Sequence, residues 1–423
     1  MASGKFKLLP ILGIGLAAAL LVFSALDFLG SYFSGRPDLA SLRRATRFSP
    51  GNASYHSQLG RYLQITNGDL RESLSEYQTA ARLNPNDSGA WFDIVGIQQI
   101  LGNSREQSRA LEEAVRAAPK KPDVAWESGN FFLLRGDRDK AMSAFRIVLE
   151  NDPRSAPAAL DLLWRVQPDA GTLLERAVPP IASAYSSFLV MLISKQETDA
   201  ASKVWSALLQ LQQPIAPGVG LAYVNYLLGK LQPEAARQAW LQMAPLCGLT
   251  AYLPGQNLIV NPRFELDVLN AGFDWHYDKL HDVKINLDAN AAPRGNQSLL
   301  VTFEGPGISE TGLAQAVSLA PNSQYQFSVH FKSDQFEGAG GPVFVLRDAL
   351  TGKEYFTTEA LRNPGSWREV TAHFQTGAGA QLALLRLSRI PAGNAIRGHL
   401  WLDEVQLVRL SFQGLEEEHL LWR

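Results

Sequence analysis

The sequence is poor in cysteine, in histidine and in net charge. Its 423 residues include one cysteine, Cys247, and seven histidines. A single cysteine excludes an intramolecular disulfide and any zinc site with two or more thiolate ligands. Lysine and arginine number 39 against 41 acidic residues, whereas proteins that coat nucleic acid carry a clear positive excess. The composition therefore points away from a disulfide scaffold, a thiolate metalloenzyme and a nucleic-acid binder.

The sequence also lacks the motifs of common catalytic sites. It has no G-x-S-x-G nucleophile elbow, and its glycine-rich stretch 338–341 is not followed by a Gly-Lys-Ser/Thr helix start. His276 and His281 are five residues apart, which suits neither one helix face nor one strand face. We therefore predict that the protein is not an enzyme. A degenerate glycan-active enzyme stays an alternative, because a catalytic carboxylate pair is defined by its distance in space.

One long uncharged run stands near the start of the chain. Residues 8–26 contain 19 residues without a charge, after Lys5 and Lys7 and before Asp27. As a helix this run is about 28 Å long, close to the hydrocarbon thickness of a bilayer. We predict a cytoplasmic tail and transmembrane anchor helix over 1–30. A cleaved signal peptide is the alternative, but Phe23 occupies the −3 position of the best cleavage site, where a small residue is usual.

A repeat follows the apolar run. Pro85, Pro119 and Pro153 end similar tripeptides at steps of 34 residues. This is the period of the tetratricopeptide repeat, a pair of antiparallel helices closed by proline. Small residues and aromatic residues recur at the expected positions, as Gly129 and Phe145 do. The chain therefore resembles the tetratricopeptide repeat family over 52–153, with one extra residue near 67–68 in the first repeat.

The repeat pattern continues in a degenerate form over 154–250. Ala201 and Trp205 recur as Ala236 and Trp240, a step of 35. We predict a helical bridge at 161–177 and helices at 181–194, 199–211, 218–228 and 233–243. The whole helical array is expected over 31–250. Its concave face is expected to bind a protein partner through polar side chains, with Gln58, Arg61, Asp93 and Gln98 as candidates.

The period changes from helical to alternating after Gly255. Apolar side chains at every second position, as in Tyr325, Phe327, Val329 and Phe331, are typical of half-buried strands. Clusters of glycine, proline and asparagine separate these runs. About eight or nine short strands are expected, which is typical of an all-β sandwich. We predict a jelly-roll sandwich over 255–411 and a tail over 412–423.

The sandwich has a second resemblance. Residues 257–265, Asn-Leu-Ile-Val-Asn-Pro-Arg-Phe-Glu, followed by Gly-Phe-Asp-Trp at 272–275, look like the opening of galactose-binding-like jelly rolls, which include carbohydrate-binding modules. This resemblance implies a structural calcium with Glu265 and Asp403 as ligands. It also implies a sugar platform, for which Trp275, Tyr277 and Phe336 are the candidates, although the position of Trp275 is usually a core position in such folds.

The predicted fold class is multidomain. It combines one transmembrane helix, an α-solenoid of tetratricopeptide-like hairpins and an all-β jelly-roll sandwich. The expected function is a non-enzymatic adaptor in the bacterial inner membrane, with the bulk of the chain periplasmic or otherwise outside the cytoplasm. It would bind a protein partner and polysaccharide, but no nucleic acid and no cofactor apart from the calcium. Exopolysaccharide or envelope polysaccharide assembly or export is the expected setting, and a purely protein-binding scaffold is the alternative.

Overall fold

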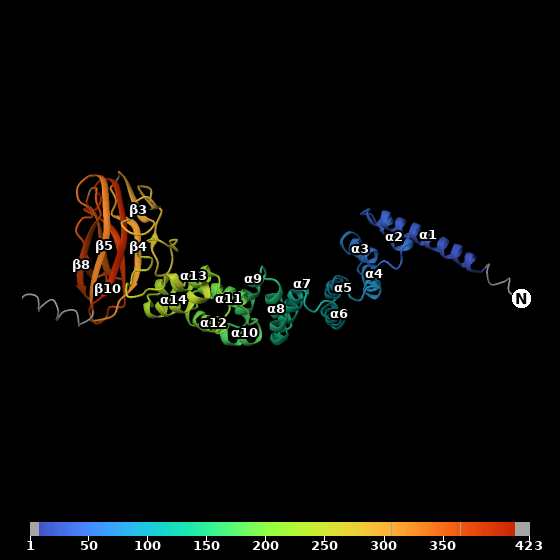
Figure 1. Cartoon of the computed structure of the whole chain (residues 1–423). Helices are drawn as coiled ribbons and strands as arrows, with labels where there is room; N and C mark the ends of the chain where they lie inside the picture. The colour runs from blue at the N-terminus through green and yellow to red at the C-terminus, as the bar shows by residue number, and fades with distance from the viewer. Residues whose placement is uncertain (1–7, 306, 364, 411–423) are drawn as a thin grey trace, which may run out of the picture. The chain divides into compact units, whose positions relative to one another are not determined.

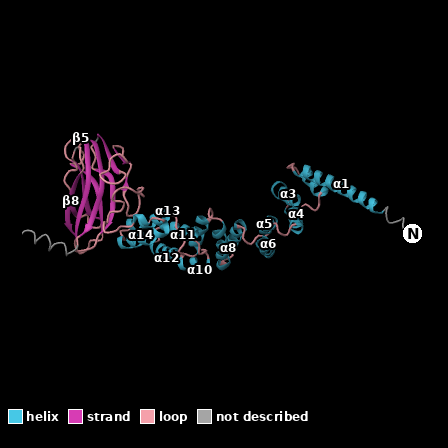
Figure 2. Cartoon of the chain, in the orientation of Figure 1, coloured by secondary structure: helices cyan, strands magenta, loops and turns pink. Residues whose placement is uncertain are grey.

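The computed structural model describes residues 8–305, 307–363 and 365–410 (Figure 1). The chain divides into two compact units, Met1–Pro179 and Pro180–Arg423. In the described part of the chain, the first unit is helical and the second contains helices followed by β-strands (Figure 2). Lys5, Lys7 and the tail expected at 412–423 lie outside the described residues.

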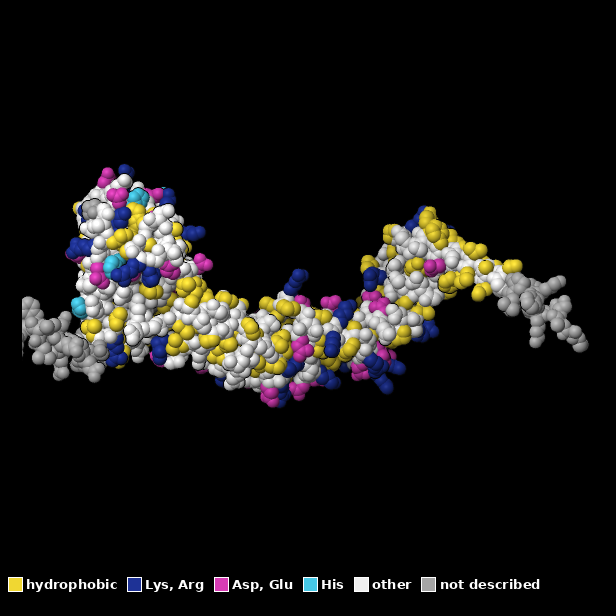
Figure 3. Space-filling model, viewed as in Figure 1, with side chains coloured by type: hydrophobic (Ala, Val, Ile, Leu, Met, Phe, Trp, Pro, Cys, Tyr) yellow, Lys and Arg dark blue, Asp and Glu magenta, His cyan; other side chains and the backbone are white. Residues whose placement is uncertain are grey.

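The first unit begins with a single long apolar helix, α1 (Leu8–Ser34). In the part of the chain that the structure describes, it is the one helix long and apolar enough to cross a membrane. Apolar side chains are visible on the face of α1 seen in Figure 3, and Phe23 and Phe28 are each 70% exposed. By length and composition, α1 fits a membrane anchor and also a signal sequence. Its final turns pack against the first short helix, where Phe33 stacks on Phe48 at 5.7 Å between ring centroids.

Short amphipathic helices follow α1 and pack as antiparallel neighbours. Aspartates cap several of them: the Asp69 carboxylate accepts a hydrogen bond from the Glu72 backbone N–H at 3.0 Å, as N-caps do. In chain order the helices are α2 (Leu39–Phe48), α3 (Ala53–Tyr62), α4 (Leu70–Leu83), α5 (Ser88–Ile100), α6 (Ser104–Ala117), α7 (Pro122–Leu134), α8 (Arg138–Asn151), α9 (Ala156–Val166) and α10 (Ala170–Arg176).

Glycines let the two helices of a hairpin approach closely. A Cβ atom on Gly129 of α7 would lie 2.7 Å from the Phe145 ring of α8, and one on Gly60 of α3 would lie 3.0 Å from the Tyr77 ring of α4. Phe145 and Tyr77 are fully buried as a result. The tetratricopeptide-like pattern read from the sequence is therefore confirmed as a packing device, in which a small residue on one helix receives an aromatic ring from the next.

The extra residue of the first repeat is absorbed in a π-helical turn, η1 (Leu63–Asn67), which directly continues α3. A π-turn bonds each residue to the fifth along the chain, and such turns occur as single-turn bulges in helices. Gly68 then ends the turn at φ +66°, a conformation that glycine adopts without strain. The insertion therefore stays local, and the later repeats keep their step of 34.

The segment expected to be a helical bridge, 161–177, is helical and is occupied by parts of two helices. Helix α9 ends at Val166, and α10 begins at Ala170. Pro168 lies between them, and a proline without an N–H disfavours a continuous helix. Asp169 then starts the second helix, since its carboxylate accepts a hydrogen bond from the Thr172 backbone N–H at 2.7 Å.

The second unit opens with two more helical hairpins. Their helices agree closely with the degenerate repeats expected from the sequence: α11 (Ala182–Ser194), α12 (Thr198–Gln210), α13 (Pro217–Gly229) and α14 (Pro233–Cys247). Trp205 of α12 and Trp240 of α14 are both buried. A short 3-10 turn, η2 (Thr250–Tyr252), leads from α14 toward the strands.

Ten strands form two five-stranded antiparallel sheets in the described part of the second unit, slightly more than the sequence predicts. The first sheet has the order β1-β4-β9-β6-β7, and the second has the order β2-β3-β10-β5-β8. The strands are β1 (His276–Tyr277), β2 (Val283–Asp288), β3 (Ser298–Gly305), β4 (Glu310–Ser318), β5 (Gln324–Glu337), β6 (Gly341–Asp348), β7 (Glu354–Thr357), β8 (Arg368–Gln375), β9 (Leu382–Ile390) and β10 (Ile396–Arg409).

The sandwich core follows the alternation in the sequence. Four alternating residues of β5, namely Tyr325, Phe327, Val329 and Phe331, are buried. In β10, Leu402 and Val405 are both fully buried although they are three residues apart. A bulge between Asp403 and Gln406 explains this slip, because an extra residue in one strand resets which side chains face inward.

The last hairpin and the sandwich share a close contact. The Gly272 backbone N–H donates a hydrogen bond to Asn225 Oδ1 of α13 at 2.7 Å, and a Cβ atom on Gly272 would lie 2.3 Å from the Trp240 ring. The Tyr252 hydroxyl donates to the Asp267 carbonyl at 2.8 Å. These contacts place α13 and α14 in the same compact unit as the strands, so this unit extends across the boundary expected at 250–255.

Candidate functional site

The outer face of the second sheet presents an aromatic side chain. Strand β10 lies between β3 and β5, and its inward residues Leu400 and Leu402 are fully buried. Since side chains of a strand alternate between faces, His399 and Trp401 lie on the opposite, outer face. Both are partly exposed. Trp401 therefore stands on a central strand with polar neighbours on both sides.

Polar groups hold the Trp401 ring in place. Its Nε1–H donates a hydrogen bond to Asp288 Oδ2 of β2 at 2.8 Å, and this bond lowers the pKa of the Asp288 carboxyl. The Lys332 ammonium of β5 lies 5.2 Å from the ring centroid. His399 contacts the ring at 5.8 Å between centroids. The indole is thus fixed by residues from three strands.

More hydrogen-bonding groups surround this aromatic centre. The Thr302 hydroxyl of β3 lies 3.2 Å from His399 Nδ1, so both of these polar side chains stand next to the ring. An aromatic side chain with hydrogen-bond donors and acceptors around it can bind a pyranose. The C–H face of the sugar stacks on the aromatic ring, and the sugar hydroxyls form hydrogen bonds with the polar groups. We call Trp401, His399, Lys332 and Asp288 the Trp401 platform.

The three sugar-binding residues predicted from the sequence do not meet at one place. Trp275 is fully buried, and its Nε1–H donates to the Asn261 carbonyl at 3.2 Å. No face of this ring reaches a ligand, so Trp275 is wrong as a platform residue and belongs to the core. Tyr277 is half-buried in β1 of the other sheet. Phe336 is half-buried on β5, where it packs on Phe303 at 5.7 Å.

Sequence reasoning missed Trp401, although a signal was present. The alternation that places Leu400 and Leu402 in the core also places the residue between them on the outer face. A tryptophan there has no core to fill. What the alternation does not reveal is which neighbouring strands bring Asp288 and Lys332 beside it, because that depends on the strand order.

Asp403 is the strongest of the predicted calcium ligands. Its side chain is fully buried, and burial raises its pKa to about 6. Oδ1 accepts a hydrogen bond from the Glu404 backbone N–H at 2.7 Å, whereas Oδ2 has no hydrogen-bond partner among the described residues. A buried carboxylate oxygen without a donor is costly. Such an oxygen fits a cation ligand in kind.

Glu265 lies close enough for its charge to act on Asp403 and to raise the pKa of that carboxyl further. It already has partners: Oε1 accepts from the Asn296 backbone N–H at 2.7 Å and Oε2 from Asn296 Nδ2 at 3.3 Å. These bonds lower the pKa of Glu265. Within residues 8–305, 307–363 and 365–410, no group of three or more His, Cys, Asp or Glu side chains could hold a metal ion. The two carboxylates would therefore need carbonyl or water oxygens to complete a calcium site.

The four residues predicted to bind a partner on the repeats have different environments. Arg61 and Asp93 form an ion pair at 3.5 Å between the first and second repeats, and Gln58 is exposed on α3. Gln98 is only 5% exposed, and it accepts a hydrogen bond from Asn103 Nδ2 at 3.0 Å. Gln98 is therefore wrong as a surface residue, because its amide closes the α5–α6 turn instead.

Comparison with solved structures finds likenesses to parts of the chain. The sequence matches no known protein-family model. A solved structure described as "CBM4 structure and function" is 15% identical, with 36% of this chain and 99% of that chain covered and a TM-score of 0.28. The CBM22-1 xylan-binding domain from Paenibacillus barcinonensis Xyn10C is 21% identical, with 35% and 92% covered and a TM-score of 0.25. MamA is 15% identical, with 45% and 92% covered and a TM-score of 0.27. The described part of the chain itself contains helical hairpins with the tetratricopeptide-like packing described above, a sandwich of two antiparallel sheets and one apolar N-terminal helix.

Proposed function

We propose that this chain is a non-enzymatic, membrane-anchored adaptor that binds a protein partner through its helical repeats and a glycan through its sandwich. Its proposed setting is the bacterial inner membrane, with the repeats and the sandwich outside the cytoplasm, in exopolysaccharide or envelope polysaccharide assembly or export. The observation that carries the glycan part is the Trp401 platform, an aromatic ring on an outer sheet face with fixed polar neighbours.

The chemistry of the platform favours sugar over an apolar ligand. The Asp288 carboxylate and the Lys332 ammonium touch the edge and the face of the indole, so an apolar ligand would leave both charges desolvated. A sugar offers hydroxyls to both groups and an apolar C–H patch to the ring. Neighbouring His399 adds a further donor or acceptor.

Titration of the full chain in detergent with a polysaccharide panel that includes xylan and β-1,4-galactotriose tests the glycan role. Trp401→Ala should weaken binding about tenfold to a hundredfold, as loss of a central aromatic anchor does. His373→Ala is the matched control, since His373 lies exposed on β8 of the same sheet, away from the platform. Failure of every polysaccharide to bind, with or without calcium, would reject the glycan role and favour the purely protein-binding scaffold.

Calcium is proposed to bind at Glu265 and Asp403. The orphaned Asp403 Oδ2 supports this proposal, and a bound divalent cation would supply structural cross-linking of the opening segment to β10. Tyr277 and Phe336 stay as further proposed sugar contacts. Substitution of either by alanine should reduce affinity less than Trp401→Ala does, because both side chains already pack against the sandwich core.

The protein-binding role is proposed for the surface around Gln58, Arg61 and Asp93. A photo-crosslinking residue at Gln58 in the full chain, irradiated in native membranes, should give one discrete adduct. Arg61→Glu should remove this adduct, while the same probe at the exposed residue Gln210 of α12 should give none. Equal labelling at both positions would remove the repeat surface from the proposal and leave the anchor and the sandwich.

The anchor is tested separately. Full-length protein should resist extraction from membranes by alkaline carbonate and keep an intact N-terminus by mass spectrometry. Loss of residues before Ala25 or Leu26 would identify a cleaved signal sequence instead. Protease treatment of spheroplasts should digest the repeats and the sandwich if they lie outside the cytoplasm, and digestion only after lysis would reverse the orientation.

A further inference from the structure

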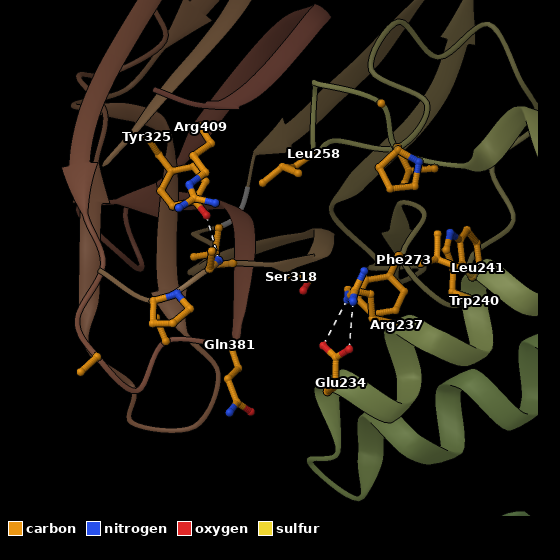
Figure 4. Close-up of a pocket in the computed structure, with 18 residues that line it drawn as sticks. Glu234, Arg237, Trp240, Leu241, Leu258, Phe273, Ser318, Tyr325, Gln381 and Arg409 are labelled. Carbon is orange, nitrogen blue, oxygen red and sulfur yellow. Dashed lines mark hydrogen bonds and ion pairs between the residues drawn. The ribbon is translucent and has the colours of Figure 1, made fainter. Parts of the chain in front are cut away.

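A cavity of about 660 Å³ lies where the last helical hairpin meets the sandwich, within the second compact unit (Figure 4). Helix α14 lines one side with Trp240 and Leu241, and the sandwich lines the other with Phe273, Leu319 and Tyr325. A cavity of this size, lined mainly by apolar and aromatic side chains, is typical of a ligand or peptide site. We call it the junction pocket.

The lining of the junction pocket also contains a hydrogen-bond donor and two cationic side chains. The Trp240 side chain is only 2% exposed, and its indole N–H has no acceptor among the described residues. A buried donor without an acceptor is destabilising, so a ligand that supplies an acceptor is favoured there. Arg237 and Arg409 add two cations to the lining. Arg237 is bonded to Glu234 at 2.9 Å, so its charge is partly balanced.

The occupant is indicated by where the described chain ends. Arg409, the last residue of β10, lines the junction pocket, and the Leu410 backbone N–H donates to the Gln324 carbonyl at 2.9 Å. The segment that follows, 411–423, reads Ser-Phe-Gln-Gly-Leu-Glu-Glu-Glu-His-Leu-Leu-Trp-Arg. It therefore carries a triple glutamate, 416–418, followed by three large apolar side chains, 420–422.

We propose that the junction pocket is a peptide-binding site for segment 411–423 of the same chain. Leu420, Leu421 and Trp422 occupy the apolar lining, and the glutamates 416–418 lie against Arg237 and Arg409. A backbone carbonyl of the segment accepts the hydrogen bond that the Trp240 indole lacks. The segment thus offers acidic groups for the two arginines of the lining and an apolar cluster for its apolar side chains.

The segment has the reach to do this. Leu420 lies ten steps along the chain from Leu410, and an extended chain covers about 33 Å in that length. Since β10 ends at the pocket wall, this is more than enough to turn back into it. Tethering gives such a contact an effective concentration in the millimolar range, so even a weak peptide contact is occupied.

Disulfide trapping in the full chain tests the proposal. With the buried Cys247 replaced by alanine, Ser318→Cys in the pocket wall is combined with Leu421→Cys. We expect an intramolecular disulfide that forms at least tenfold faster than with Thr371→Cys, an exposed position on β8, in place of Ser318→Cys. Equal rates for the two pairs, or disulfides only between copies, would overturn the proposal, and the second result would assign the pocket to a neighbouring copy.

A second measurement separates the charged from the apolar contribution. Changing glutamates 416–418 to glutamine should slow trapping several-fold at low salt and leave little difference at high salt, because exposed charges are screened. In full chain carrying serine at 420–422, a synthetic peptide of sequence 411–423 should bind, and Trp240→Phe should weaken it by removing the indole donor. Absence of peptide binding, together with unchanged trapping in the glutamine variant, would reject the proposed contacts.

Discussion

Gly129 and Gly272 both lie against an aromatic ring, but the two contacts join very different pieces of chain. Gly129 receives Phe145 from the other helix of its own hairpin, whereas Gly272 is in a loop of the sandwich and receives Trp240 from α14. The first contact recurs two repeats apart, since Gly60 receives Tyr77 in the same way. The second occurs at the junction and has no counterpart from which a period could be read. The same kind of glycine–aromatic contact therefore joins two helices of one hairpin at Gly129. At Gly272 it joins a loop of the sandwich to a helix.

Buried polar groups differ between the two regions as well. In the repeats, His56 Nδ1 lies 2.6 Å from Glu76 Oε2 and Nε2 lies 3.0 Å from the Pro50 carbonyl, so both ring nitrogens have partners. In the sandwich, Asp403 Oδ2 and Asp274 Oδ1 are buried and have no hydrogen-bond partner within the part of the chain that the structure describes. Both nitrogens of His56 are thus satisfied, whereas each of these two sandwich carboxylates keeps one oxygen available to a donor or a cation.

The largest expected effect comes from Gly272→Ala. Gly272 has φ +65°, and the added Cβ would lie 2.3 Å from the Trp240 ring. Backbone strain and overpacking together should lower the free energy of unfolding of the second unit by about 4 kcal/mol. Urea unfolding followed by tryptophan fluorescence measures this. An effect below 1 kcal/mol would mean that the loop and α14 separate easily, and the comparison with the hairpins would fail.

Gly129→Ala should have an intermediate effect, about 2 kcal/mol of lost stability in the repeats. The new Cβ would meet the ring of Phe145 at 2.7 Å, but the backbone of α7 is helical and suits alanine. Circular dichroism at 222 nm during heating follows the loss. The double variant Gly129→Ala with Phe145→Leu should recover part of the stability, and no recovery would place the cause elsewhere.

Asp403→Asn tests whether ionisation of the buried Asp403 carboxyl destabilises the sandwich. The pKa of Asp403 is raised to about 6 from an ordinary 3.8, so the folded state holds its proton more tightly than the unfolded state. Its contribution to stability is complete below about pH 4 and is lost as the pH rises through 6, by on the order of 3 kcal/mol. The asparagine variant should lack this loss, and calcium at pH 7 should raise the melting temperature of the wild type only. Asp267→Asn, at an exposed position, is the control. A wild-type stability that rises between pH 4 and 6 relative to the asparagine variant would contradict the assignment.

The smallest effect is expected for Gly96→Ala. Gly96 lies within α5, and an added Cβ would have no heavy atom within 4 Å. Alanine restricts the unfolded chain more than glycine does, so the variant should be more stable by about 0.5–1 kcal/mol. Melting temperatures of this variant and of Gly129→Ala, measured side by side, distinguish a glycine that packs against an aromatic ring from one that does not. A loss of stability at Gly96 would remove that distinction.

The sequence predicts most of the fold because its two periods are local. Helices α3 to α8 follow from prolines and glycines at a fixed step, and the strands follow from alternation, including the slip at Asp403. The candidate site was less predictable. Trp275 and Gln98 are of the right residue type for a surface role, yet a hydrogen bond within the fold holds each in a buried position. The Trp401 platform needs β2 and β5 on either side of the β3–β10 pair, an order that no local pattern contains.

The hydrogen bond from the Gly272 N–H to Asn225 has a consequence for modular exchange. Suppose that the sandwich were transferred to another protein from about residue 255 onward. The Gly272 N–H would then lose its hydrogen-bond acceptor, Asn225 of α13, and the Gly272 loop would lose its contact with the Trp240 ring of α14. It would also expose Phe273, which lies 5.9 Å from the Trp240 ring between centroids. The smallest part of this chain that can be transferred with its packing intact therefore begins before α13. A recombined gene that encodes the sandwich must also encode the final helical hairpin.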